Sequence, residues 1–112
     1  MSHINTTFHL QLLLQTMNIE QYPFIKLIII NNLSSQEYEE LFMLLEQLNE
    51  MYKVQKEEGL LDFTSLLIHF AGMLNQKLDP TETIYALKKE GHFPNLMEEF
   101  MQIIEDAKKE QL

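Results

Sequence analysis

The chain has 112 residues and a formal net charge of −9, with 17 acidic residues against 8 lysines and no arginine. This balance argues against binding to nucleic acid or to an anionic membrane, because both partners are themselves negatively charged. The chain also has no cysteine, which excludes disulfides, thiolate metal sites and thiol nucleophiles.

Two helices are predicted before the first long one. Asn5–Met17 is predicted as a helix, since Phe8 and Leu12 lie one turn apart on the same line. Pro23–Asn31 is predicted as a second helix that begins with proline. Its β-branched Ile28–Ile30 would also suit an extended strand, but no second strand is available to pair with it. Helix is therefore preferred, and the extended form stays open.

The longest helix is predicted from Ser34 to about Glu57. Ser34 is suited to cap its start and Glu37 to complete a capping box, while Gly59 is placed to end it. Apolar residues at spacings of three and four give this helix one buried face. They are Tyr38, Leu41, Phe42, Leu45, Leu48 and Tyr52.

The stretch DFTSLLIHFAGMLN, residues 62–75, is predicted as a helix with Asp62 at its N-cap. It is apolar nearly all round and too short to span a bilayer, so we predict a central helix wrapped by the others. Glycine inside a helix costs about 1 kcal/mol relative to alanine. We therefore predict close helix packing at Gly72, with a hinge as the alternative, and expect Gly72→Leu to unfold or rearrange the protein.

The last two helices are predicted at Pro80–Glu90 and Pro94–Lys109. Asp79 is a suitable N-cap for the first of them, and Gly91 is placed to end it. The sequence thus predicts an all-α fold of about six helices in one domain that spans residues 1–112.

His69 and Ser65 are the candidate polar site of the central helix. They lie one turn apart on the same face, where a serine–histidine dyad is conceivable. No GxSxG turn or glycine-rich loop accompanies them. We interpret the pair mainly as a structural polar core, with a ligand contact as the alternative and catalysis as the least favoured reading.

No metal, cofactor or DNA site is predicted. The four histidines are scattered, and neither HxxxH nor ExxH spacing occurs. Residues 82–106 suggest a helix-turn-helix, but Glu98 and Glu99 would face phosphates where lysine or arginine belongs. An ordinary helical hairpin is preferred.

Seven methionines are many for so small a core. Met43 and Met51 lie beside charged positions of the longest helix, and methionine serves both as a gap filler and as an adaptable partner surface. We predict a possible interface at Met43 and Met51, in a homo-oligomer or with an unidentified protein partner. Packing alone is the alternative.

The string HFAGMLNQKLD at His69–Asp79, with YPF at Tyr22–Phe24 and DF at Asp62–Phe63, resembles the YhaI-like proteins. The similarity covers about Asn18 to Glu105. The resemblance implies an all-helical cytoplasmic protein of Gram-positive bacilli with an uncharacterised role. It implies no catalytic or binding residues.

Together these features predict a non-catalytic module, not an enzyme, that acts by protein–protein contact or regulation and self-associates. A cytoplasmic location is expected, because the first apolar run makes a poor signal peptide and no run is long enough to span a bilayer. The alternative is a small-ligand binder or an enzyme with a pocket near His69.

Overall fold

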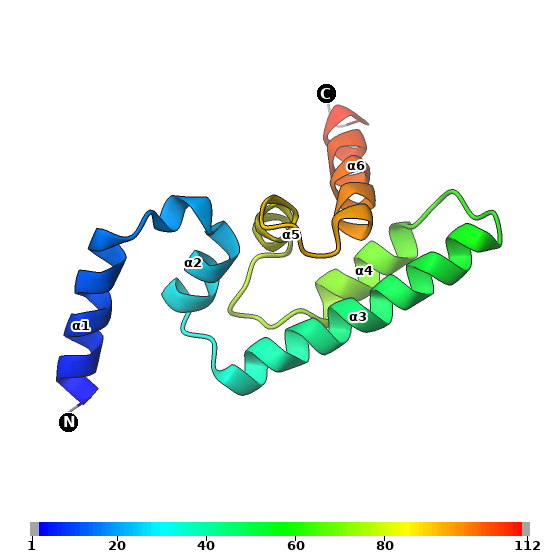
Figure 1. Cartoon of the computed structure of the whole chain (residues 1–112). Helices are drawn as coiled ribbons and strands as arrows, with labels where there is room; N and C mark the ends of the chain where they lie inside the picture. The colour runs from blue at the N-terminus through cyan, green and yellow to red at the C-terminus, as the bar shows by residue number, and fades with distance from the viewer. Residues whose placement is uncertain (1–2, 111–112) are drawn as a thin grey trace.

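A computed structural model describes the chain from residue 3 to residue 110, with side chains from residue 5 (Figure 1). All the regular secondary structure of the described residues is helical, and no strand occurs among them. The predicted all-α fold is therefore confirmed. In chain order the elements are α1 (His3–Thr16), the short 3-10 helix η1 (Ile19–Gln21), α2 (Pro23–Ile30), α3 (Ser35–Glu57), α4 (Thr64–Met73), α5 (Pro80–Lys89) and α6 (Pro94–Glu110).

The helix ends follow local capping chemistry. At the start of α3 the Glu37 N–H donates to Ser34 Oγ over 3.1 Å, and the Ser34 N–H donates to Glu37 Oε1 over 2.9 Å. The Asp79 carboxylate likewise accepts the Glu82 N–H at the start of α5. Gly59 and Gly91 adopt positive φ angles of 88° and 80° just after α3 and α5. These predicted boundaries are therefore confirmed.

α2 is a helix, so the extended alternative for this segment is wrong. Its first turn has no side-chain cap of its own. Instead the Glu90 carboxylate, at the end of α5, accepts the N–H groups of Phe24 and Ile25. Phe24 is fully buried, and its ring lies 5.8 Å from that of Phe42 and 5.6 Å from that of His92. Tertiary packing and a long-range cap thus outweigh the β-branched composition.

Glu90→Ala is expected to lower the free energy of unfolding by about 0.5–2 kcal/mol, the usual cost of losing a helix cap. The stability falls because two N–H groups in the first turn of α2 lose their hydrogen-bond acceptor. Chemical denaturation measures the change. Glu39→Ala, at an exposed position of α3, is the matched control and should stay within about 0.5 kcal/mol of the wild type. Equal losses in the two variants would contradict the capping role.

The core lies where α2 to α6 meet, with α5 between α2 and α6 and with α4 between α3 and α6. Its fully buried side chains are Phe24, Phe70, Phe100, Leu45, Leu48, Leu66, Ile84, Leu87, Leu96, Met97 and Thr83. Within the described part of the chain, no helix combines the length and the apolar character needed to cross a membrane.

α4 does not have the all-round burial predicted for it. Leu66 and Phe70 face the core, but Ile68 and Met73 are each 66% exposed. The helix starts one residue later than expected, with Phe63 in place of Asp62 at its N-cap position. Asp62 instead accepts both the N–H and the hydroxyl of Thr64, and these hydrogen bonds lower its pKa. Among the described elements, α4 packs mainly on α3 and α6, and the residues on its outer side are exposed.

The predicted close helix packing at Gly72 is wrong for the single chain. Gly72 is exposed, and a Cβ built on it would meet nothing within 4 Å. Within residues 3–110, no other helix approaches Gly72 closely. The leucine side chain of Gly72→Leu would point into open space, so this substitution is not expected to unfold the single chain.

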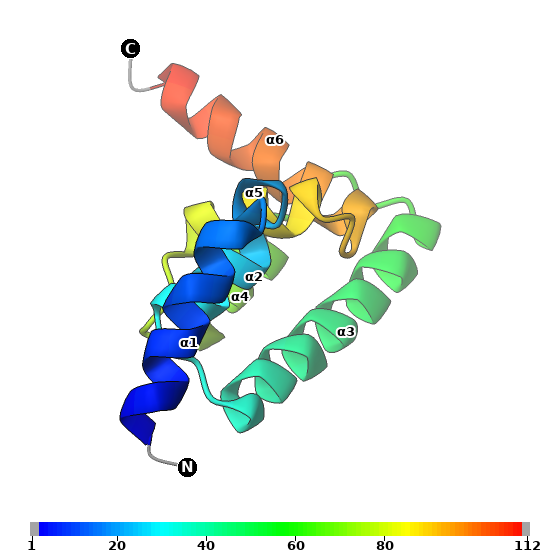
Figure 2. The same ribbon diagram turned by 60° about the vertical axis from the view of Figure 1, so that its left-hand side comes forward.

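α1 stands away from the bundle, at one end of the molecule (Figures 1 and 2). Leu14 is half-buried, and every other α1 side chain that the structure describes is exposed. The exposed fractions are 55% for Phe8, 50% for Leu10, 43% for Leu12 and 55% for Leu13. An isolated helix of this length is only marginally stable in water. The 14 residues of α1 therefore need a further contact to hold them.

Candidate functional site

A groove of about 560 Å³ runs between α3 and α4. Residues 40, 43, 44 and 47 of α3 fall on one line beside its buried face, which places them along one wall. The buried Leu41 and Leu74 form the floor. The complete lining is Glu37, Glu40, Leu41, Met43, Leu44, Gln47, Met73, Leu74 and Asn75.

Two exposed methionines flank this groove, Met43 on α3 and Met73 on α4. Their exposed fractions are 68% and 66%. The unbranched thioether side chain adapts to partners of different shape. Met51, predicted together with Met43, packs against the core and offers less free surface. Met73 was not predicted as an interface residue, because the sequence placed it on a helix buried all round.

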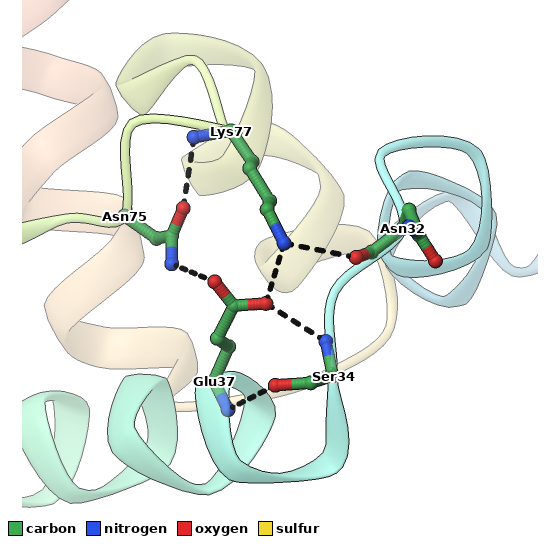
Figure 3. A network of polar contacts seen from close by, with 5 residues as sticks. All are labelled: Asn32, Ser34, Glu37, Asn75 and Lys77. Carbon is green, nitrogen blue, oxygen red and sulfur yellow. Dashed lines mark hydrogen bonds and ion pairs between the residues drawn. The ribbon is translucent and has the colours of Figure 1, made fainter.

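One end of the groove is closed by a polar network around Glu37 (Figure 3). Asn75 Nδ2 donates to the Glu37 carboxylate over 2.8 Å, and Lys77 Nζ donates to it over 2.7 Å. Lys77 also donates to the Asn32 carbonyl over 3.1 Å. The Lys77 bond, followed by those from Ser34 and Asn75, lowers the pKa of Glu37 from 4.5 to about 2. The network ties the loop after α4 to the start of α3.

This network predicts a pH-dependent stability. The folded pKa of Glu37 lies below its ordinary value, so its contribution is complete above about pH 4.5 and is lost as the pH falls towards 2. Glu37→Gln should therefore lower the melting temperature at neutral pH. The difference in melting temperature between the variant and the wild type should become smaller as the pH falls. Thermal unfolding at several pH values tests this, with the exposed Glu39→Gln as control. A gap that stays constant across this range would contradict the assignment.

His69 and Ser65 lie on the outer side of α4. Ser65 is exposed and His69 is partly buried, so the predicted buried polar core at this pair is wrong. The reason is again that this side of α4 is left largely exposed by the elements that the structure describes. Neither residue lines the α3–α4 groove. A ligand contact at His69 stays a prediction that these contacts do not test.

The α3–α4 groove offers apolar contact edged by hydrogen-bond acceptors. Glu40 and Gln47 line it beside the methionines, while Glu37 is occupied by its own network. Among the side chains that the structure describes, no three His, Asp or Glu residues gather in a way that could hold a metal ion. The shape of this groove suits the binding of an apolar helix or of an apolar segment in an extended conformation.

A second groove, of about 500 Å³, lies between α2 and α5. Its apolar floor is edged by charges of both signs, including the Lys26–Glu20 ion pair at 2.6 Å. The lining is Glu20, Pro23, Lys26, Leu27, Ile30, Asn31, Glu82, Tyr85, Ala86 and Lys89. This groove differs from the first in that lysines as well as acidic residues line it.

Comparison with known families identifies an uncharacterised family. The family is described as "Protein of unknown function (DUF1878)", and its profile matches residues 3–105. The match therefore takes in all the elements that form both grooves, together with α1. The chain belongs to this uncharacterised family.

Proposed function

We propose that this protein is a non-catalytic module that acts by protein–protein contact and associates with further copies of itself. One observation carries the proposal. α1 presents large apolar side chains to solvent, among them Phe8, Leu10 and Leu13 at 50–55% exposure. Apolar surface of this kind on a separate helix usually marks an interaction site. Burial in a partner would supply the contacts that hold the helix.

The nearest available partner for such a helix is another copy of the same chain. The exposed methionines beside the α3–α4 groove, Met43 and Met73, provide a second apolar surface on each copy. A closed homo-oligomer would cover both surfaces with contacts that repeat in every copy. The resemblance to the YhaI-like proteins, together with the absence of cysteine, supports a role in the bacterial cytoplasm.

Light scattering coupled to size-exclusion chromatography tests self-association. The weight-average mass is expected to rise from that of one chain to at least that of two as the concentration increases from low to high micromolar. Leu61 provides a matched control, because it is a leucine that is 92% exposed outside any helix. Leu13→Gln should weaken the association, whereas Leu61→Gln should leave it unchanged. A mass that stays at one chain throughout the series would refute the proposal.

A further inference from the structure

Two of the six α-helices carry no charged residue, and both expose apolar surface. They are α1, whose whole segment up to residue 19 lacks Asp, Glu and Lys, and α4 at Thr64–Met73. Every other described α-helix contains at least one lysine or acidic residue. Two chains of net charge −9 repel each other, and the repulsion is least where neither surface is charged. The charge pattern therefore points to α1 and α4 as surfaces that can meet.

The apolar side chains of α1 form two stripes on opposite sides of the helix. At 3.6 residues per turn, one stripe consists of Leu10, Leu13 and Leu14 and is continued by Met17 just after the helix ends; we name these four residues the leucine stripe. The other consists of Phe8 and Leu12. The leucine stripe has the spacing of three and four residues with which one helix packs along another. It is the longer of the two and includes Met17, which is 54% exposed.

The matching surface is the α3–α4 groove together with the adjoining side of α4. We name it the α3–α4 surface and define it by Met43, Met73, His69 and Gly72. Met43 and Met73 line the groove itself, and Gly72 lies outside the groove lining, on the adjoining exposed side of α4. A glycine on a helix surface lets a second helix approach closely because no Cβ intervenes. Gly72 lies inside α4 in sequence, and a Cβ built on it would meet no described neighbour within 4 Å. Contact with a helix of a second copy would give this glycine a packing role.

We propose that α1 of one copy lies along the α3–α4 surface of a second copy, with its leucine stripe against Met43 of α3 and against Met73 and Gly72 of α4. This assignment rests on the self-association proposed above. Within one chain α1 lies at the far end of the molecule from α4, so the contact is one between copies (Figure 1). Reciprocal exchange of α1 would give each copy one donated helix and one occupied groove.

The area available suits a stable pair. Leu10, Leu13 and Met17 are about half exposed, and Met43 and Met73 are about two-thirds exposed. Summed over the five side chains, this exposure equals that of about three fully exposed large apolar residues from each copy. A standard interface uses about 800 Å² from each partner, of which about 60% is apolar. The five side chains therefore contribute a substantial share of the apolar part of such an interface.

The polar residues at the edges are also compatible. Beside its stripes α1 carries amides, among them Gln11 and Gln15, and amide groups can donate to the carboxylate of Glu40 or the carbonyl of Gln47 at the groove. The α2–α5 groove is a poorer place for α1. Its lining carries four charged side chains, against two in the α3–α4 groove, and an uncharged helix would have to desolvate more of them without neutralising them.

Paramagnetic relaxation between two copies tests the placement. The chain has no cysteine, so Gln11→Cys offers a single site for a nitroxide tag on α1, outside the leucine stripe. This copy is mixed with an untagged copy whose methionine methyl groups carry carbon-13. The methyl signals of Met43 and Met73 are expected to broaden strongly, while that of Met17 in the untagged copy is broadened less.

The other outcomes separate the two proposals. Broadening of Met17 alone, in a mixture that light scattering shows to be associated, would mean that α1 pairs with α1 and would overturn this placement only. An associated mixture without broadening at Met43 and Met73 would overturn it as well. A mixture that is monomeric at every concentration would remove the self-association proposal and this placement together.

A pair of variants on α4 gives a second readout. Gly72→Leu places a bulky side chain under the docked helix, whereas Ala71→Leu places the same side chain about 100° further round α4, on the side away from Met73. Gly72→Leu should keep the helical circular dichroism of the wild type, because its Cβ meets nothing within the chain. It should raise the dissociation constant at least about tenfold, and Ala71→Leu should not. A dissociation constant unchanged by Gly72→Leu would overturn the placement.

Discussion

Phe70→Ala is expected to lower the free energy of unfolding by about 3–5 kcal/mol, the range for removal of a buried aromatic side chain. Phe70 is fully buried, and its ring lies 5.8 Å from that of Phe100 on α6. Removing it leaves a cavity at the point where α4 and α6 meet. Urea unfolding at low protein concentration, where a single chain is measured, gives the change directly.

The matched control lies two residues earlier on the same helix. Ile68 is 66% exposed, so Ile68→Ala should change the free energy of unfolding by no more than about 0.5 kcal/mol. The contrast tests whether α4 is buried on one face rather than on all sides. If the two variants lost comparable amounts of unfolding free energy, α4 would be buried on all sides, which would contradict its one-sided burial in the structure.

Leu10→Glu combined with Leu13→Glu is expected to abolish self-association while α2 to α6 stay folded. Both leucines are at least half exposed in the single chain, so the core loses nothing. In an associated state the two carboxylates would be buried without a partner, and each copy already carries a charge of −9. The melting temperature of the wild type should rise with protein concentration, because binding stabilises the folded state, and that of the variant should not.

Gln11→Glu combined with Gln15→Glu controls for charge alone. The two glutamines lie between the apolar stripes of α1, so the same net charge is added without burying it. This control should keep most of the concentration dependence of the melting temperature. Its complete loss in both double variants would assign the effect to repulsion between chains and not to a contact of the leucine stripe.

The parts of the fold that depend on neighbours in sequence could be predicted. Ser34 and Asp79 cap helices by bonds that reach three residues, and Gly59 and Gly91 end helices by their own φ angles. Such signals need no knowledge of the tertiary structure. They located α3 and α5 to within one residue, and with them the walls on which the groove residues stand.

The remaining features depend on contacts between distant residues. Glu90 caps a helix that lies more than 60 positions away, and Lys77 reaches Glu37 across 40. Neither pairing leaves a local pattern. The burial of α4 was predicted wrongly for the same kind of reason. Composition shows that a helix is apolar all round, but not whether its outer side is covered by its own chain or left open.

Gly72 illustrates the difference most clearly. The sequence identified it as a glycine without a local role, and that observation stands, since it lies inside α4 and has no positive φ angle. The inferred neighbour within the chain does not exist. The sequence does not show whether a packing neighbour of Gly72 belongs to the same chain or to another molecule. In the proposed contact, that neighbour is α1 of a second copy.

Amide hydrogen exchange of α1 as a function of protein concentration tests the central claim most directly. In the single chain α1 is a separate helix with exposed side chains, so its amides should exchange nearly as fast as those of an unfolded peptide at low concentration. At high concentration they are predicted to become protected, as α1 is held against a second copy. Amides of α1 that exchange equally fast at every concentration would contradict the account.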